Sequence, residues 1–149
     1  MIYDLSDSHI PEGIGNKATY LMRLKQAGFR VPDGFVLGTG IFDETVVRAG
    51  AETEIASILR SLTRENITAS GESLDGITKK FLLPESAVAE ISLRIKPDMK
   101  YAVRSSATKE DLGSLSFAGQ YKTFLNISGV AAVAEAVTEC YRSLYAGTV

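Results

Sequence analysis

The sequence has little of what usually marks a reactive or metal-binding site. Its 149 residues include no tryptophan, one cysteine (Cys140) and one histidine (His9). A lone cysteine cannot form an internal disulfide, and one histidine, one cysteine and scattered acids match no metal-ligand spacing. His9 stands in a polar leading segment, which is typical of a surface residue, and no Gly-x-Ser-x-Gly motif indicates a serine nucleophile. We therefore predict no metal site and no catalytic residue.

A strong charge of one sign and a long apolar run are also lacking. The formal net charge is -2, so no basic field favours a nucleic-acid partner. No apolar run approaches the roughly 20 residues of a membrane-spanning helix. The first residues have neither the basic nor the apolar region of a signal peptide. We expect a cytoplasmic protein without membrane or nucleic-acid partners.

The sequence does contain enough apolar residues for a packed domain. Hydrophobic residues make up 45% and charged residues 23%, which are ordinary values for a globular chain. Apolar spacing predicts helices that begin near residues 17, 55, 88 and 130, and strands at 35–37, 101–103 and 121–127. The polar stretch 68–76 is expected to be a loop. These elements predict an α+β fold with a small mixed sheet and flanking helices.

The last expected helix carries a broad apolar stripe near the end of the sequence. The stripe consists of Val130, Val133, Ala134, Val137, Tyr141, Leu144 and Tyr145. No polar tail follows it, so we expect that the chain is part of a longer domain.

The segment from Tyr101 to Ile127 has the composition of a phosphate cradle. The loop between its two expected strands is rich in glycine and serine, so its backbone can approach a ligand and its amides can bind an anion. Arg104, at the entrance of the loop, has a planar fork of donors that suits phosphate oxygens. The alternative is a solvated hairpin connection in which Arg104 makes a surface ion pair with Glu110 or Asp111.

A second cation, Lys17, falls in the first turn of the first expected helix. Gly15 precedes it, and Gly28 stands where the helix should end. A cation in this turn opposes the helix macrodipole by roughly 0.3–1 kcal/mol, unless an anion shares the site. A phosphate would satisfy Lys17, Arg104 and the free N–H groups of the helix start together. The alternative is a lysine that points into water at a frayed helix start.

At these positions the sequence resembles a known family, that of the phosphoenolpyruvate synthases and pyruvate phosphate dikinases. The similar segments are Gly15-x-Lys17-Ala18, Val-Pro-Asp-Gly-Phe-Val at 31–36, Val-Arg-Ser-Ser-Ala at 103–107 and Ser-Phe-Ala-Gly-Gln at 116–120. The wider family includes glucan water dikinases and rifampin phosphotransferases. The resemblance extends from near Gly15 to the end of the chain. It implies the first lobe of an ATP-grasp-like nucleotide-binding domain, with ATP as the ligand.

The resemblance also implies which residues bind the nucleotide. The family's phosphate-binding lysine falls on Lys17, its phosphate-binding arginine on Arg104, and a hydroxyl beyond the phosphate-covering loop on Thr123. That loop itself falls on Ser116, Phe117, Ala118, Gly119 and Gln120. The implied function is the ATP-binding part of a phosphotransferase. Such an enzyme passes a phosphoryl group from ATP to a histidine on another domain and then to pyruvate.

The family pattern continues beyond the sequence of this chain. A second lobe with the adenine pocket and the magnesium carboxylates, and a domain with the phosphohistidine, are absent. We therefore expect residues 1–149 to form a partial nucleotide-binding domain that is inactive alone and works with ATP, Mg2+ and the remaining domains. Two alternatives stay open: the ATP domain of a phosphotransferase for rifampin or glucan, and a non-catalytic nucleotide-binding or interaction module.

Overall fold

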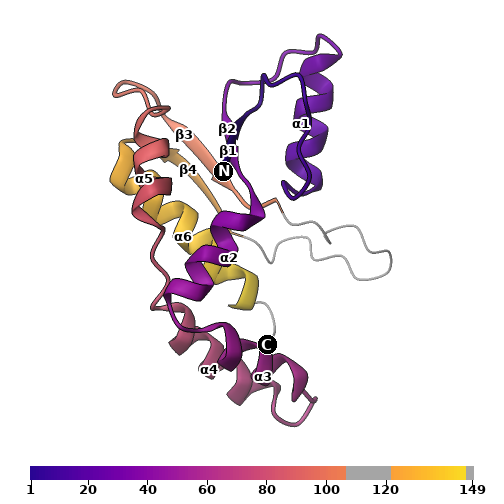
Figure 1. The fold of residues 1–149 in the computed structure, drawn as a ribbon, viewed down its shortest axis with the longest axis vertical. Coiled ribbons are helices and arrows are strands. Elements are labelled where there is room, and N and C mark those ends of the chain that lie inside the picture. Colours follow the sequence, from indigo (N-terminus) through magenta and orange to yellow (C-terminus); the bar gives the residue numbers. More distant parts are fainter. Residues whose placement is uncertain (107–121, 147–149) are drawn as a thin grey trace.

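The computed structural model describes residues 1–106 and 122–146, in which short strands are interspersed with longer helices (Figure 1). The strands are β1 (Ile2–Asp4), β2 (Phe35–Leu37), β3 (Tyr101–Arg104) and β4 (Thr123–Ile127). The helices are α1 (Asn16–Gln26), α2 (Thr39–Arg48), α3 (Glu52–Arg60), α4 (Ile67–Thr78), α5 (Glu85–Ser92) and α6 (Val130–Ala146). The predicted α+β class is confirmed.

The strands form two separate antiparallel pairs. β1 pairs with β2, and β3 pairs with β4 in a register that places Arg104 opposite Thr123. The predicted pairing of the strands on either side of the long loop is confirmed. The predicted mixed sheet is wrong for the described residues, where both pairs are antiparallel. Side chains alternate with a period of two residues in parallel and antiparallel strands alike, so the sequence pattern could not decide the direction of pairing.

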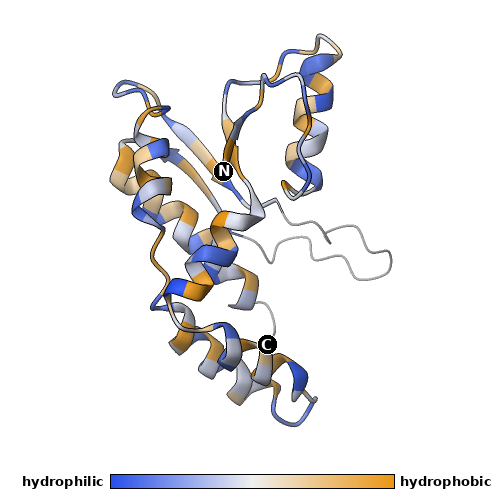
Figure 2. Cartoon of the chain, in the orientation of Figure 1, coloured by the Kyte–Doolittle hydropathy of each residue, from blue (hydrophilic) through white to orange (hydrophobic). Residues whose placement is uncertain are grey.

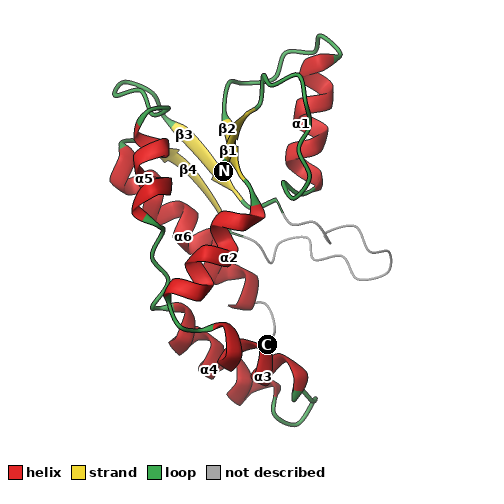
Figure 3. Cartoon of the chain, in the orientation of Figure 1, coloured by secondary structure: helices red, strands yellow, loops and turns green. Residues whose placement is uncertain are grey.

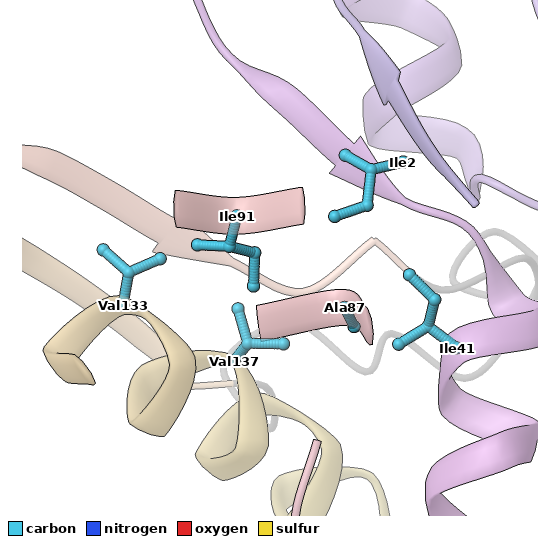
Figure 4. Packing of buried hydrophobic residues seen from close by; sticks show 6 residues of the cluster. All are labelled: Ile2, Ile41, Ala87, Ile91, Val133 and Val137. Atoms are coloured by element: carbon cyan, nitrogen blue, oxygen red, sulfur yellow. The ribbon is translucent and has the colours of Figure 1, made fainter. Parts of the chain in front are cut away.

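The β1–β2 pair lies between two apolar clusters, because its side chains alternate between two faces. Ile2 lies in one cluster, against which Phe35 and Leu37 pack, while Tyr3 and Val36 pack against the other. The first cluster comprises Ile2, Ile41, Ala87, Ile91, Val133 and Val137 (Figure 4). The second cluster comprises Leu5, Ile14, Ala18 and Met22. Accordingly, α1 lies on the opposite side of β1–β2 from α5 and α6 (Figure 1).

One face of the β3–β4 pair packs on the first cluster, and the other face is open. Tyr101, Val103 and Ile127 pack against that cluster, to which α6 contributes two valines. Arg104 and Thr123, which point away from it, are exposed. The open face of this strand pair therefore carries the two side chains that the sequence assigned to a phosphate site.

The segment 67–78 is a helix, α4, where the sequence analysis expected a loop (Figure 3). Its glycines and serines have weak helix propensity. However, Leu74 is fully buried and Ile77 almost so, in a cluster with Phe81. The Arg142 side chain of α6 donates to the carbonyls of Thr78, Lys79 and Phe81 around the C-terminus of α4. Tertiary burial and this remote cap outweigh the local preference, which is why the prediction was wrong.

The end of α1 agrees with its prediction. Gly28 has a φ of 83°, its N–H donates to the Lys25 carbonyl, and the Phe29 N–H donates to the Leu24 carbonyl. This is a Schellman motif, for which a glycine in the left-handed region is typical.

The helices carry both apolar and polar residues, as Figure 2 shows by their mixed colours. This composition suits helices that bury one face and expose the other. Among the described residues, none of the helices combines the length and the apolarity needed to cross a bilayer.

Candidate functional site

The start of α1 is held by a short loop that contacts the first turn of α2. Gly13 and Gly15 have φ values of 74° and 76°, and Ile14 between them is buried in the second apolar cluster. The N–H of Thr39, the first residue of α2, donates to the Gly13 carbonyl at 2.8 Å. The buried isoleucine and this hydrogen bond fix the loop from which α1 begins.

Ser106, two residues beyond β3, contacts the same loop and the helix that follows it. The N–H of Ala18 donates to Ser106 Oγ at 3.1 Å, although the two residues are 88 positions apart in the sequence. Gly15 is buried, and a Cβ added to it would collide with the Ser106 carbonyl oxygen. The absence of a side chain at Gly15 therefore permits the end of β3 to lie against the start of α1.

This contact brings together the segments that carry the two predicted phosphate-binding cations. Lys17 immediately precedes Ala18, and Arg104 precedes Ser106 by two residues. Thr123 lies opposite Arg104 across the strand pair, and residues opposite each other point to the same face. Lys17, Arg104 and Thr123 are all exposed to solvent, and so accessible to a ligand.

The electrostatics of this region favour an anion. The first turn of α1 contains no acidic residue, so no carboxylate of its own offsets the positive end of the helix dipole. Lys17 adds a full positive charge in that turn, and Arg104 adds another at the end of the neighbouring strand. This charge pattern is compatible with the predicted phosphate site.

One part of the predicted anion site needs correction. The N–H groups at the start of α1 were predicted to be free for a phosphate, but that of Ala18 donates to Ser106 Oγ. An anion at this place therefore cannot use the Ala18 amide and depends more on the cationic side chains.

The remaining predicted binding residues lie outside the described part of the chain. They are Ser116, Phe117, Ala118, Gly119 and Gln120. Glu110 and Asp111, the alternative ion-pair partners of Arg104, lie outside it as well. The role of this loop stays a prediction.

The other reactive residues do not form a second site. Cys140 is buried in α6, and burial raises the pKa of its thiol to about 11, so the thiolate needed for nucleophilic chemistry is scarce at neutral pH. His9 is exposed. Within residues 1–106 and 122–146, no three His, Cys, Asp or Glu side chains gather in a way that could hold a metal ion.

Sequence reasoning missed the role of Ser106. Its partner in α1 is 88 positions away and could not be identified from local spacing. Two features of the sequence could have indicated this role. The residue at the cap position of α1 is a glycine, which has no side chain to cap the helix, and a serine pair directly follows Arg104. Helix N-termini need such an acceptor, and here a distant segment supplies it.

Comparison with known proteins agrees with the class of site that this geometry indicates. Residues 11–148 match the family model described as pyruvate phosphate dikinase, AMP/ATP-binding domain. The match covers most of the chain, and the chain belongs to this family. The resemblance stated from the motifs is thus confirmed.

Individual relatives carry the names of two enzymes. A probable phosphoenolpyruvate synthase of Methanothermobacter thermautotrophicus is 38% identical over 142 residues, covering 88% of this chain and 21% of that protein. Another, of Archaeoglobus fulgidus, is 36% identical and covers 95% of this chain and 20% of its own length. A rifampicin phosphotransferase of Streptomyces sviceus is 32% identical and covers 89% and 16%, respectively. The chain thus spans about a fifth or less of the curated relatives that it matches.

Proposed function

We propose that this chain is the ATP-binding part of a dikinase-type phosphotransferase, with the triphosphate held between the start of α1 and the end of β3. One observation carries the proposal. The hydrogen bond from Ala18 to Ser106 joins the segment of Lys17 to the segment of Arg104, which supports one site served by two cations from distant parts of the sequence. The membership of the AMP/ATP-binding family supports a nucleotide as the ligand.

In this proposal the residues act by positioning and by offsetting charge. Phosphoryl transfer places negative charge on the oxygens of the transferred group, and fixed cations stabilise that charge. Lys17 supplies a compact ammonium and Arg104 a planar fork of donors for two oxygens. Thr123 supplies a hydroxyl on the same face as Arg104. The backbone of residues 116–120 would cover the phosphates, as the resemblance implies.

The described residues fit the phosphate groups better than they fit a metal ion. No cluster of metal-ligating side chains occurs in the described ranges, so no step of the proposal involves a metal bound by this part of the chain. We propose that the ligands of Mg2+, which would offset further charge on the triphosphate, belong to a second lobe of an ATP-grasp-like domain.

The proposed acceptor is a histidine on another domain, and the final substrate is pyruvate. The names of the phosphoenolpyruvate synthase relatives, at 34–38% identity, support this choice. The rifampicin phosphotransferases are 32–33% identical, so an antibiotic acceptor is the second candidate. Both candidates use the same ATP site, and the described residues do not distinguish between them.

The ligand is tested by titrating the 149-residue chain with ATP and following the amide signals by NMR, which detects weak binding. We expect saturable shifts around Lys17 and Arg104, and weaker binding in Lys17→Ala. Lys80→Ala, which changes an exposed lysine just beyond α4, is the matched control and should bind as the wild type does. Absence of saturable shifts at millimolar ATP would contradict the proposal.

A second experiment tests whether phosphoryl transfer requires other domains. Because the family resemblance assigns the magnesium ligands and the phosphohistidine to other domains, we expect no transfer from ATP to pyruvate by these 149 residues alone. The measurement is the appearance of phosphoenolpyruvate in a reaction with the purified chain, ATP and pyruvate. Product formed at a rate proportional to the concentration of the chain would refute the view that other domains are required.

A further inference from the structure

The N-terminus of α1 is capped by a residue from another part of the fold. The residue at the cap position is Gly15, and no side-chain cap is formed within the helix start itself. Ser106 provides the missing acceptor through its Oγ, to which the Ala18 N–H donates at 3.1 Å. Ala18 occupies the third position of the helix, which is where an N-cap hydroxyl normally accepts its hydrogen bond. Ser106 thus performs locally the task of a cap residue, although it follows β3.

Gly15 has a backbone that suits this arrangement for two reasons. Its φ of 76° lies in the left-handed region that favours glycine. In addition, a Cβ would collide with the carbonyl oxygen of Ser106. The first requirement is common in turns, but the second exists only because β3 ends against this position. The fold therefore provides space at Gly15 for the Ser106 backbone as well as a donor at Ala18 for its side chain.

The apolar contacts of α1 do not by themselves fix its position relative to the end of β3. Ala18 and Met22 bury the inner face of the helix against Leu5 and Ile14. Apolar burial is non-directional, so a helix can slide or tilt by small amounts while it retains most of this burial. The hydrogen bond to Ser106 is directional and connects the first turn of α1 to the end of β3.

We propose that Ser106 is a positioning residue, which fixes Lys17 relative to Arg104 so that both cations can bind one chain of phosphates. This inference rests on the proposed ATP-binding function. Ser106 acts through the helix that carries Lys17, and its hydroxyl is already engaged with Ala18. The role is therefore distinct from direct contact with the nucleotide.

The neutrality of the cap supports this role. Aspartate and asparagine cap helices as well as serine does. An aspartate at position 106 would, however, place a negative charge next to the phosphates and would offset Lys17. A hydroxyl satisfies the Ala18 amide and leaves the positive potential of the site undiminished.

The test compares four variants of the 149-residue chain: Ser106→Ala, Ser106→Thr, Ser106→Asp and, as the matched control, Ser105→Ala. The first readout is hydrogen exchange at the Ala18 amide without nucleotide. We expect exchange roughly fivefold faster in Ser106→Ala, because a typical cap is lost, and no change in Ser105→Ala. Unchanged exchange in Ser106→Ala would overturn the proposal without any reference to ATP.

The second readout is the dissociation constant for ATP, with thermal unfolding measured in parallel. We expect Ser106→Ala to bind roughly fivefold more weakly, Ser106→Thr to bind within about twofold of the wild type, and Ser106→Asp to bind more weakly than Ser106→Ala. Ser106→Thr retains the hydroxyl, so a loss in Ser106→Ala that is absent in Ser106→Thr attributes the effect to the cap, while Ser106→Asp shows the added effect of a negative charge.

The outcomes distinguish this inference from the proposed function. If the wild type binds ATP and Ser106→Ala binds equally well, the positioning role is wrong while ATP binding stands. If the wild type shows no saturable ATP binding, the proposed function fails and the positioning role fails with it. If the loss in Ser106→Ala matches a general loss of folded protein in thermal unfolding, Ser106 is a stability residue and the inference is overturned.

Discussion

The region around α4 and α6 and the region where α1 meets β3 are held together in different ways. Around α4, large side chains such as Leu74 and Phe81 are fully buried, and Arg142 caps three carbonyls with one guanidinium. Where α1 meets β3, the described residues include a buried glycine, Gly15, against the Ser106 backbone, and a hydrogen bond from Ala18 to Ser106. The first region is stabilised by the burial of large side chains, and in the second region the backbones of two segments approach each other closely.

This difference explains where the cations can serve a ligand. A packed region buries its side chains, and its charged groups are engaged with one another, as Arg142 is with Glu135 and Glu139. The junction of α1 and β3 needs little side-chain volume, so Lys17 and Arg104 stay exposed beside it. A site for a charged ligand is therefore compatible with the second kind of contact and not with the first.

The largest effect on stability is expected for Phe81→Ala in the packed region. Phe81 is 0% exposed and contacts the ring of Tyr145, whereas its neighbour Leu82 is 70% exposed. Deleting a buried aromatic side chain costs about 3–5 kcal/mol of unfolding free energy. Leu82→Ala, the matched control, should change it by less than about 0.5 kcal/mol. Urea unfolding of both variants measures the change in unfolding free energy. Equal losses would show that burial of the Phe81 side chain does not dominate the stability of this region.

The next largest effect is expected at the junction and concerns binding. Arg104→Ala removes a charge-assisted contact to phosphate, which should weaken ATP binding by about 1.5–3 kcal/mol, or roughly tenfold to a hundredfold. Lys100→Ala, which changes an exposed cation just before β3, should have little effect. Titration with ATP and thermal unfolding are measured for both. A loss in Arg104→Ala that thermal unfolding fully explains would mean that Arg104 is a structural residue.

Two glycines with nearly equal φ angles differ in what surrounds them. Gly15 and Gly28 have φ values of 76° and 83°, but a Cβ at Gly28 would meet nothing within 4 Å. Gly28→Ala should therefore lose only about 1–2 kcal/mol, the cost of the left-handed conformation. Gly15→Ala should lose that amount and, in addition, displace Ser106 and weaken ATP binding. Equal stability and equal ATP affinity of the two variants would show that the close approach at Gly15 is unimportant.

The smallest effect is expected for the ion pairs of α6. Hydrogen bonds from Lys122 and then from Arg142 hold the pKa of Glu139 below its ordinary value of 4.5. A lowered pKa in the folded state means that the contribution of Glu139 is present above about pH 4.5 and is lost as the pH falls through the lowered value. Glu139→Gln should remove this part of the acid sensitivity, at most about 1 kcal/mol.

The control for this prediction is Glu72→Gln, on the exposed side of α4. Thermal unfolding between neutral and acidic pH should give parallel curves for the control and the wild type, and a flatter acid branch for Glu139→Gln. A flatter branch in both variants would attribute the effect to net charge rather than to the ion pairs.

Local patterns in the sequence were enough to predict several features of this protein. The Gly28 cap ended α1 as expected, the apolar stripe of α6 was correct at Val133 and Val137, and the strands around the long loop were paired as expected. The motifs around Gly15 and Arg104 were also sufficient to identify the family to which the chain belongs. These features depend on neighbours within a few residues, which a pattern in one sequence can show.

Features that depend on partners distant in the sequence could be established only from the three-dimensional fold. The helix α4 forms because α6 caps it and Leu74 is buried, against the preference of its glycines and serines. The direction of strand pairing and the presence of β1, which the sequence did not predict, depend on which segments meet in space. The bond between Ser106 and Ala18 joins residues 88 positions apart, and no local pattern encodes it. Burial and directional hydrogen bonds between distant segments outweigh local propensity, and at the junction of α1 and β3 they also determine where Lys17 and Arg104 lie.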